Sequence, residues 1–482
     1  MHIKELSAPT RYPQFLNELN EILGDRWVSV NNLDRLAYSY DIWPVVSTMV
    51  HRGEVPYWPE IIAWPGNAEE VSAVLKIAGR FGVAVVPFGG GSGVVGGIIQ
   101  LRGGITLDVK RMDRILSIDR ISLSVQVEAG AMVQDLEDKL NHHGLSLGHF
   151  PQSMHSATIG GCIAHNGIGT FSTKYGKFDD MVLGIQVVVP NGDIVNITPV
   201  PKRSTGPNLN ELFLGSEGTL GVVTQATLKI HPLPEQRIFQ SYSVSNMRLG
   251  LDIIRNVVQH DLVPAVVRLY DEHEGKGLIF DSVGMEDGKC LLIFCYEGYR
   301  QLIELQAKLS SEICISMGGL ELGPEPGRIW FETKRFDVRH YLSATVKPSR
   351  IADTLEIAAP WNKLADIYYA IMEAMNKFPC KSMGHCSHVY PQGANLYMIF
   401  FAEASDPDPE VVQALYFKIL EATFKTCVRL GGTISHHHGI GMAKKQWMEL
   451  EHGQAGMNIM HAIKKAIDPD NIMNPGKLGI GE

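Results

Sequence analysis

Three consecutive histidines, His436, His437 and His438, lie near the C-terminus in the segment Ser435–Gly439. Histidine can take up or release a proton near neutral pH, so these side chains are candidates for acid–base work in a reaction. If the segment is extended, His436 and His438 face one side and His437 faces the other. Two imidazoles could then act together on one reacting group. The structural alternative is a histidine tract that is hydrogen-bonded near a domain interface.

A glycine-rich segment, from Pro87 to Gly97, is the second candidate for chemistry. It follows an apolar run that is predicted to be a buried strand. Glycine adopts backbone angles that other residues avoid, which lets a loop turn several N–H groups toward an anion. The segment therefore predicts a phosphate-binding loop, and a glycine-rich turn without a ligand is the alternative.

The same loop contains the pattern G-x-G-x-x-G, formed by Gly91, Gly93 and Gly96, with Asp108 downstream. This pattern is typical of nicotinamide dinucleotide sites, where it opens a helix. Here residues 97–104 leave no room for a crossover helix and lead into a strand predicted over 105–109. We therefore reject the nicotinamide interpretation and expect a loop between two strands that wraps a pyrophosphate.

The composition restricts the class of protein. A chain of 482 residues with 45% hydrophobic residues can form two or more domains, and its net charge of −9 argues against a nucleic-acid partner. Its seven cysteines include no C-x-x-C pair, which argues against a cysteine-rich zinc site or an iron–sulfur cluster and favours a reducing compartment. We expect no transmembrane segment and a cytoplasmic location.

The remaining sequence predicts the elements that position these loops. The segment Asn191–Gly192 is typical of a tight hairpin after a strand. From about residue 236 to 425 strands alternate with long amphipathic helices, which indicates a separate α+β domain. Glycine-rich sequence returns after residue 431, and we expect the tail to fold back on the first domain.

The periodicity predicts helices over 12–24, 67–81, 132–143, 246–260, 298–312, 361–378 and 454–467 and strands over 124–128 and 182–189.

Three motifs carry a resemblance to a known family: PFGGGSG at 87–93, QSMHSAT followed by IGG at 152–161, and EGTLGVV at 217–223. With them the chain resembles the FAD-binding proteins of the vanillyl-alcohol oxidase type, also called PCMH-type. The resemblance implies an α+β fold in which a PCMH-type FAD-binding domain of two subdomains carries an α+β cap. It implies an N-terminal helical segment over 1–54, the FAD-binding domain over 55–235, the cap over 236–428 and a C-terminal segment over 429–482 that completes the active site.

The resemblance also implies which residues bind FAD. The first loop contributes Pro87, Phe88, Gly89, Gly90, Gly91, Ser92 and Gly93, and the second contributes Gln152, Ser153, Met154, His155, Ser156, Ala157, Thr158, Gly160 and Gly161. His165, Asn166, Gly167 and Ile168 follow by position, and the third loop contributes Glu217, Gly218, Thr219, Leu220, Gly221, Val222 and Val223. Some members of the family attach FAD through a histidine of the first loop. This loop has none, so we expect non-covalent FAD.

Two branches of the family share features with the chain. Glycolate oxidase and D-lactate dehydrogenase-like members share the C-terminal segment Asn474–Lys477, and many of them bind a metal through two histidines and a glutamate. Tyr397 and His437 stand where the second histidine and the glutamate would be. A site built from His385, His388 and 436–438 remains an alternative, since imidazoles suit zinc or iron, but we expect no metal.

Alkylglycerone-phosphate synthase is the other branch, and its local motifs match more closely. It shares the S-H-H-H-G motif, the Arg268–Asp271 segment and Tyr390 before a Gly-Ala pair. It also shares the segments at 204–207, 359–361 and 444–447. One departure matters, because the synthase has arginine at the position of His385.

The resemblance implies an enzyme that passes hydride from a small anionic hydroxy compound, a 2-hydroxy acid or a phosphorylated polyol, to FAD. Tyr390 or a histidine of 436–438 would take the hydroxyl proton, and Arg268 would bind the carboxylate or phosphate. The alternative is a synthase-like transferase that exchanges an acyl group for a fatty alcohol on a ketone phosphate. Oxygen, an electron-acceptor protein or a quinone could reoxidise FAD, and the family-based expectation for assembly is a homodimer.

Overall fold

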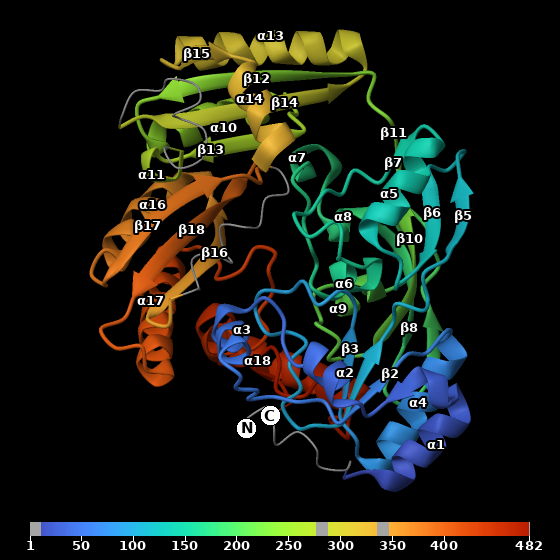
Figure 1. The fold of residues 1–482 in the computed structure, drawn as a ribbon. Coiled ribbons are helices and arrows are strands. Elements are labelled where there is room, and N and C mark those ends of the chain that lie inside the picture. Colours follow the sequence, from blue (N-terminus) through green and yellow to red (C-terminus); the bar gives the residue numbers. More distant parts are fainter. Residues whose placement is uncertain (1–10, 276–287, 335–346, 482) are drawn as a thin grey trace.

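The computed structural model describes residues 11–275, 288–334 and 347–481, which form three large sheets and a two-stranded one with helices around them (Figure 1). The first sheet has the strand order β1-β2-β4-β3 and is parallel except for β1 at its edge. Helices α1 and α4 cover it, and their apolar residues form one core with its strands. The bounds are α1 Pro13–Leu23, β1 Val28–Ser29, β2 Ile61–Ala63, α4 Ala68–Phe81, β3 Val85–Phe88 and β4 Ile105–Asp108.

The second sheet is antiparallel, with the order β5-β6-β10-β8-β9. The predicted hairpin joins β8 to β9, and Gly192 takes a φ of 85° there. Short helices pack on this sheet and enclose a core of their own. The bounds are β5 Ile115–Asp119, β6 Ser124–Glu128, α5 Val133–His142, β7 Leu145–Ser146, α6 Ile159–Ala164, α7 Ser172–Tyr175, α8 Phe178–Met181, β8 Val182–Val188, β9 Ile194–Asn196, α9 Leu209–Phe213, β10 Val222–Lys229 and β11 His231–Pro232, with β7 paired to β11.

The third sheet has seven antiparallel strands in the order β15-β12-β14-β13-β17-β18-β16. Helices α10, α13, α16 and α17 pack on one of its faces in a continuous core. On the other face Val266 and Ile293 join the core of the second sheet. The strands are β12 Gln236–Val244, β13 Val266–Tyr270, β14 Cys290–Gly298, β15 Leu320–Gly323, β16 Arg350–Pro360, β17 Cys380–Cys386 and β18 Gly393–Glu403. The helices are α10 Met247–Gln259, α11 Glu272–Gly275, α13 Arg300–Ser316, α14 Glu325–Ile329, α16 Trp361–Met375 and α17 Pro409–Arg429.

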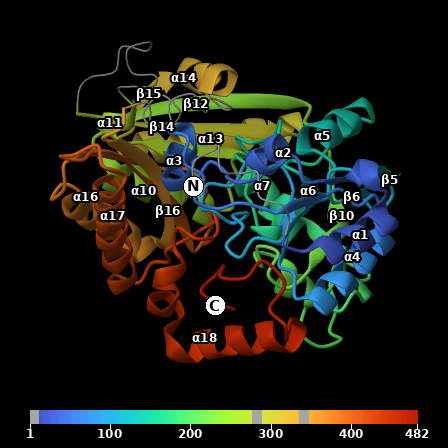
Figure 2. The same ribbon diagram turned by 60° about the horizontal axis from the view of Figure 1, so that its bottom comes forward.

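The C-terminal segment returns to the first sheet. Helix α18, Met448–Ile467, follows the short turn Lys445–Trp447 and passes along one side of the molecule (Figure 2). Beyond it, Met473 forms a parallel bridge with Val85 of β3. The Asn474 side chain donates to the carbonyls of Gly97 (2.9 Å) and Glu217 (2.6 Å). The tail therefore ties the glycine loop to the third predicted cofactor loop.

The N-terminal segment contributes to two cores. Phe15 of α1 packs against Phe81 of α4, whereas Val45 and Val46 of α3, Pro44–His51, belong to the core of the seven-stranded sheet. Between them lies α2, Asn32–Ala37.

The predicted α+β fold is confirmed, and the helices predicted from periodicity end within a few residues of those observed. The helix predicted over 454–467 begins earlier, at Met448, with a kink at Gly453. Within the described ranges, no helix is long and apolar enough to cross a membrane.

Candidate active site

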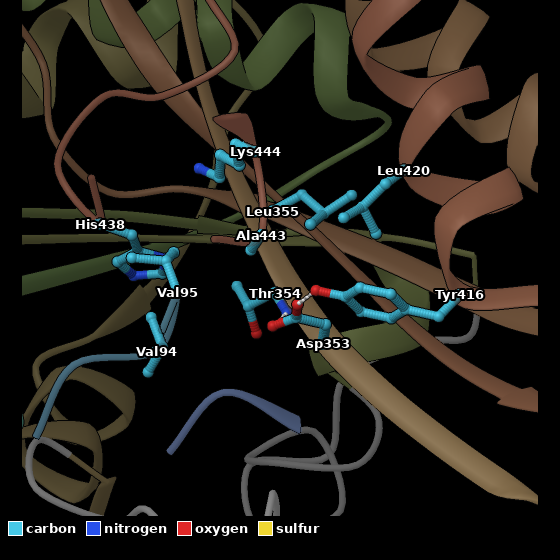
Figure 3. A pocket seen from close by; sticks show the side chains of 10 residues that line it. All are labelled: Val94, Val95, Asp353, Thr354, Leu355, Tyr416, Leu420, His438, Ala443 and Lys444. Carbon is cyan, nitrogen blue, oxygen red and sulfur yellow. Dashed lines mark hydrogen bonds between the residues drawn. The ribbon is translucent and has the colours of Figure 1, made fainter. Parts of the chain in front are cut away.

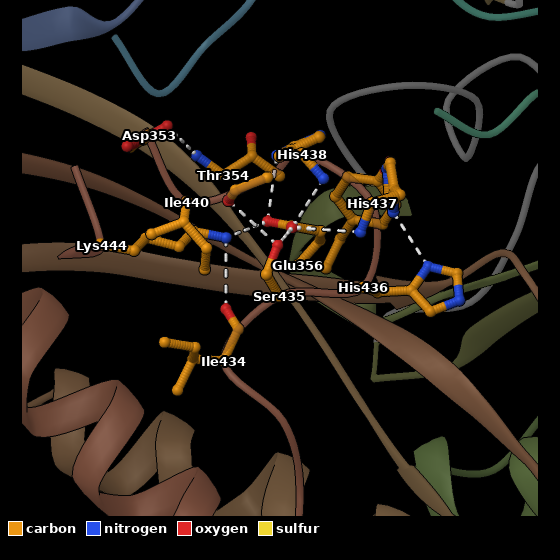
Figure 4. A network of polar contacts seen from close by, with 12 residues as sticks. Asp353, Thr354, Glu356, Ile434, Ser435, His436, His437, His438, Ile440 and Lys444 are labelled. Atoms are coloured by element: carbon orange, nitrogen blue, oxygen red, sulfur yellow. Dashed lines mark hydrogen bonds and ion pairs between the residues drawn. The ribbon is translucent and has the colours of Figure 1, made fainter. Parts of the chain in front are cut away.

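The histidine tract folds around one buried carboxylate, that of Glu356 on β16 (Figure 4). Its Oε1 accepts hydrogen bonds from the Ser435 hydroxyl (2.5 Å) and from the backbone N–H groups of His437 (3.3 Å) and His438 (2.8 Å). Its Oε2 accepts from Lys444 Nζ (2.8 Å) and lies 3.0 Å from His438 Nδ1. The loop is therefore bent because its donors converge on one carboxylate.

This bend corrects one expectation. In an extended segment His436 and His438 would lie on one side and His437 on the other. Instead the rings of His436 and His437 are in contact, with their Nδ1 atoms 2.9 Å apart, and His438 turns to Glu356. The pair of imidazoles available for chemistry is thus His436 and His437.

Glu356 is held as a carboxylate. Burial alone would raise its pKa, but His438 and Lys444 outweigh burial and hold the pKa of Glu356 well below its usual range. A group whose pKa is lowered on folding stabilises the fold above its unfolded pKa, and this contribution is lost as the pH falls through the folded value. Glu356 therefore fixes the loop at neutral pH, and the loop loses this anchor in acid.

The change Glu356→Gln should destabilise the protein by about 3–5 kcal/mol at neutral pH, because it leaves the charge of Lys444 buried without its counterion. Thermal unfolding followed by calorimetry measures this. The difference between variant and wild type should shrink as the pH falls below about 4.5, where carboxylates take up protons. Glu403→Gln is the control, since Glu403 forms an exposed ion pair with Arg350 on the same sheet. Equal midpoints for Glu356→Gln and wild type would contradict this role.

His436 and His437 belong to a chain of four polar groups. Tyr390 Oη lies 3.0 Å from His436 Nε2, and Tyr397 Oη lies 2.5 Å from His437 Nε2. With the contact between the two Nδ1 atoms, the chain runs from Tyr390 through His436 and His437 to Tyr397. Tyr397 comes from β18, directly opposite Glu356 of β16, so the strand pairing places the end of the chain beside the loop anchor. We call these four residues the relay.

Both imidazoles of the relay are neutral at physiological pH. Burial lowers the pKa of His436 to about 3, and burial together with His438 and His436 lowers the pKa of His437 well below its usual range. Burial also raises the pKa of Tyr390, which keeps its hydroxyl protonated. Each contact of the relay then holds one proton, and all three protons must point the same way along the chain. The relay can therefore exist in two orientations, which differ by the passage of one proton.

Two further histidines flank the relay. His388 is buried with its Nδ1 2.8 Å from the Ser172 hydroxyl, and its ring stacks on His436 at 5.8 Å. His385 lies 2.8 Å from Glu274 and stacks on Tyr397 at 4.5 Å. In the described part of the chain, no group of three or more His, Cys, Asp or Glu side chains is arranged to hold a metal ion. The histidines are instead paired with hydroxyls, carboxylates and each other.

Arg268, on β13, is buried to 7% exposure beneath Trp330, with its guanidinium 5.0 Å from the indole ring. Its charge is one cause, after burial and His436, of the lowered pKa of His388, which places the arginine close to the relay. Its Nε has no hydrogen-bond partner among the described residues. A buried guanidinium N–H without an acceptor is costly, so this position has the chemistry of an anion site.

The glycine loop fits a pyrophosphate. A Cβ on Gly90 would lie 1.7 Å from the Ser156 carbonyl oxygen, and one on Gly89 would lie 2.2 Å from the Thr158 hydroxyl. The first and second predicted cofactor loops therefore meet so closely that only glycine is accommodated. Among the described residues, no acceptor pairs with the backbone N–H groups of 89–93. As predicted, no helix lies between β3 and β4.

The third loop contacts the histidine tract. Glu217, with a φ of 51°, accepts from the backbone N–H groups of Ile440 (2.6 Å) and Gly441 (2.8 Å). A Cβ on Gly439 would meet this carboxylate at 2.6 Å and the His165 Cβ at 3.9 Å. The predicted cofactor loops and the predicted catalytic loop therefore adjoin. Met154, Leu220, Val222 and Val223 are buried in the cores behind these loops.

A narrow gap lies where the glycine loop faces the seven-stranded sheet (Figure 3). Val94 and Val95 line one side, and Tyr416 donates to Asp353 (2.7 Å) on the other. Burial raises the pKa of Asp353 to about 6. The gap leaves no room for a ligand, so we assign it none.

Glu356 and Tyr397 were missed as site residues by sequence reasoning. Glu356 is the one carboxylate in the otherwise apolar run 355–359 of β16, and such a residue is rarely buried without a partner. That is the signal that would have identified it. The sequence contains no comparable signal for Tyr397, apart from its position where the metal-binding branch has a histidine.

Comparison with known proteins agrees with this geometry. The family of FAD binding domains matches residues 59–198, and that of FAD linked oxidases, C-terminal domain, matches residues 233–478. The chain is 30% identical to the uncharacterized FAD-linked oxidoreductase YgcU of Escherichia coli (strain K12), over 96% of this chain and 97% of that protein. It is 29% identical to the glycolate oxidase subunit GlcD of Bacillus subtilis (strain 168), over 96% of each.

It is also 27% identical to the alkyldihydroxyacetonephosphate synthase of Dictyostelium discoideum, over 98% of this chain and 82% of that protein. A solved structure of an alkyldihydroxyacetonephosphate synthase superposes with a TM-score of 0.83 at 25% identity, covering 99% of this chain and 88% of that one. p-Cresol methylhydroxylase shares the fold, with a TM-score of 0.79 at 18% identity and 98% of each chain covered. The chain therefore belongs to the FAD-linked oxidases and is an FAD-dependent oxidoreductase of the PCMH-type fold.

Proposed function

We propose that the enzyme oxidises a small anionic hydroxy compound, a 2-hydroxy acid or a phosphorylated polyol, with non-covalently bound FAD as hydride acceptor. One observation carries this proposal: a buried arginine with an unpartnered Nε lies close to a neutral proton relay. An anionic substrate supplies the acceptor that Arg268 lacks. A hydroxyl on the same substrate supplies the proton that the relay can accept.

FAD, held by the three glycine-containing loops, supplies the two-electron acceptor. Tyr390, at the end of the relay, accepts the proton of the substrate hydroxyl while its own proton passes to His436 Nε2. His436 then gives its Nδ1 proton to His437, and His437 gives its Nε2 proton to Tyr397. Each of the four groups therefore receives one proton and releases one, and the partly exposed Tyr397 releases its own proton to solvent. No buried imidazolium has to form, which matters because burial disfavours the charged ring.

Arg268 supplies orientation. A guanidinium binds carboxylate or phosphate through parallel N–H donors, and a buried one loses less to solvent screening than an exposed one. The guanidinium packs over the Trp330 ring, which limits its freedom to move. The anion would therefore fix the position of the adjacent C–H and O–H bonds, which is how positioning lowers a barrier.

Arg268→Gln should weaken binding of an anionic substrate and lower kcat/KM by about 10²-fold or more, while the FAD content stays the same. Removing a buried charged hydrogen-bond partner typically costs about 2–5 kcal/mol. Flavin-reduction rates over a range of substrate concentrations separate KM from kcat. Arg248→Gln, which breaks an exposed ion pair with Asp366, is the control. An unchanged kcat/KM for Arg268→Gln would remove the proposed anion site.

A synthase-like transferase remains the second candidate, because a relative of that name matches nearly the whole chain and the resemblance to that branch rests on Tyr390 and the histidine tract. Such an enzyme exchanges an acyl group for a fatty alcohol and requires an apolar tunnel. The arginine that the synthase branch carries is replaced here by His385, which is paired with Glu274. This difference favours the oxidoreductase. Incubation with an acylated ketone phosphate and a fatty alcohol, followed by mass spectrometry, distinguishes the two, since only the transferase forms an ether lipid.

The electron acceptor that returns the enzyme to its oxidised state is proposed to be a protein or a quinone. A location in the cytoplasm is supported by the cysteines, all seven of which are free thiols.

A further inference from the structure

The segment between α2 and α3 contacts the glycine loop directly. The Asp41 side chain in this segment is buried to 3% exposure, and its Oδ2 accepts the backbone N–H of Gly96 (2.9 Å). The next residue, Ile42, donates its backbone N–H to the carbonyl oxygen of Gly93 (2.8 Å). Two neighbouring residues of the N-terminal segment therefore hold the second half of the loop at two points.

Trp43 keeps the Asp41 carboxylate in this position. Its backbone N–H donates to Asp41 Oδ1 (3.0 Å), and its indole Nε1 donates to the Tyr416 hydroxyl (3.1 Å) on α17. The Trp43 ring also fills the space beside the loop, because a Cβ on Gly96 would meet it at 2.8 Å and Gly96 has a φ of 75°. A Cβ on Gly93 would lie 3.3 Å from Asp41 Oδ2. The glycines at these two positions of the loop are thus matched to the N-terminal segment.

The other contacts of the loop orient its peptide groups. Several of its carbonyl oxygens accept hydrogen bonds from other segments: Gly89 from Lys110 Nζ (3.1 Å), Gly93 from Ile42, Val95 from the backbone of Met442 (2.8 Å) and Ala443 (3.0 Å), and Gly97 from Asn474 (2.9 Å). The C=O and N–H of one trans peptide point in opposite directions. Holding the carbonyl oxygens therefore also fixes the direction of the N–H groups on the opposite side of the loop.

We propose that Asp41 is a positioning residue of the FAD site, which holds the glycine loop in the form that binds the FAD diphosphate. Asp41 acts through Gly96 and not on the phosphates, since both of its oxygens already accept a backbone N–H. A loop that is held in its binding form loses less freedom when the ligand binds, so the ligand binds more tightly. The match to the FAD binding domains covers residues 59–198 and therefore leaves this segment without a role.

The change Asp41→Ala should raise the dissociation constant of FAD by about tenfold or more, because the buried N–H of Gly96 loses its acceptor. Dilution of the FAD-loaded enzyme, with the fluorescence of released flavin as the signal, measures this constant. Asp41→Asn keeps one of the two acceptor oxygens and should be intermediate. Asp34→Ala is the control, since Asp34 lies on α2 of the same segment and accepts from the Ser29 hydroxyl (2.6 Å). A wild-type dissociation constant for Asp41→Ala would overturn the proposal.

Thermal unfolding of the holoenzyme, with and without excess FAD, distinguishes positioning from a general loss of stability. A ligand raises the unfolding midpoint according to its affinity, so Asp41→Ala should need more added FAD than wild type to reach the same midpoint. Hydrogen exchange of residues 87–97 should also be faster in this variant at saturating FAD. An equal drop of the midpoint at every FAD concentration, with wild-type exchange in the loop, would mean that Asp41 supports only the fold.

The inference rests on the glycine loop as the diphosphate site and is independent of the substrate. The variant Gly90→Ala tests that premise separately, because Gly90 contacts the second cofactor loop and not the N-terminal segment. Loss of FAD from Gly90→Ala together with a wild-type dissociation constant for Asp41→Ala would overturn the role of Asp41 alone. Full FAD content in a folded Gly90→Ala protein would overturn both.

Discussion

Gly90→Ala is expected to yield a protein that purifies with less than about a tenth of the wild-type FAD content. The added Cβ would lie 1.7 Å from the backbone oxygen of Ser156, which is too short for any contact, so the glycine loop must move away from the second cofactor loop. Forcing an extra carbon into a packed contact costs about 1–3 kcal/mol or more. If the free energy of FAD binding decreases by this whole amount, the affinity for FAD falls by about ten- to hundred-fold.

The flavin absorbance relative to the protein absorbance measures the FAD content, and titration with added FAD gives the affinity. Gly79→Ala is the control, because Gly79 lies in α4 and the methyl group that alanine adds there would meet nothing within 4 Å, so full FAD content is expected. Gly91→Glu should also lose FAD, since Gly91 has a φ of 64° and an added side chain would meet the Phe88 ring at 2.7 Å, which displaces the loop and adds a negative charge to it. Circular dichroism separates loss of cofactor from loss of fold. Full FAD content in a folded Gly90→Ala protein would place the phosphate elsewhere.

Tyr390→Phe and His437→Ala are each expected to slow flavin reduction by about 10²–10⁴-fold, the usual contribution of a positioned acid or base. Tyr390→Phe removes the hydroxyl at one end of the relay, and His437→Ala removes the link between His436 and Tyr397. Anaerobic stopped-flow mixing measures the reduction step directly. FAD content should remain that of wild type in both variants.

The double variant Tyr390→Phe/His437→Ala separates a relay from independent residues. Groups that act as a unit give a double variant about as slow as the slower single variant. Independent contributions would instead multiply. His260→Ala, in which an exposed ring at the end of α10 is removed, is the control and should reduce at the wild-type rate. Wild-type rates in both single variants would move the active site elsewhere.

The pH dependence of flavin reduction also tests whether the relay is neutral. Because the pKa of His436 is lowered to about 3, the relay stays neutral through the usual range, and the limiting reduction rate should show no inflection near 6.5. Protonation of His436 in acid would occupy the Nε2 lone pair that accepts the proton from Tyr390, so the rate should fall only toward strongly acidic pH. An inflection near 6.5 that disappears in His437→Ala would mean that His437 titrates at the ordinary imidazole pKa, which would contradict the neutral relay.

The sequence was sufficient for the parts of the molecule that local patterns determine. The apolar stripe of α4, the hairpin at Asn191–Gly192 and the glycine loop between β3 and β4 all follow from residues adjacent in the chain. Rejecting the nicotinamide motif was correct for the same reason, since the space available between the two strands is a local property. The three cofactor motifs then identified the fold.

The shape of the histidine tract could not be predicted in this way. It depends on Glu356, a residue far away in the chain that reaches the tract only because β16 and β18 pair along their whole length. Local alternation predicted an extended segment, but the carboxylate collects donors from Ser435, His437 and His438 and bends the loop. Tyr397 enters the site through the same pairing. Tertiary contacts therefore decide which imidazoles face each other.

The central claim is tested most directly by mixing the oxidised, FAD-loaded enzyme anaerobically with D- and L-2-hydroxy acids and with glycerol phosphates while the flavin absorbance is followed. The account predicts that at least one of these anions bleaches the flavin promptly and that its uncharged analogue does not. If none of them bleaches the flavin, while an acylated ketone phosphate perturbs its spectrum, the oxidoreductase proposal is contradicted and the transferase takes its place.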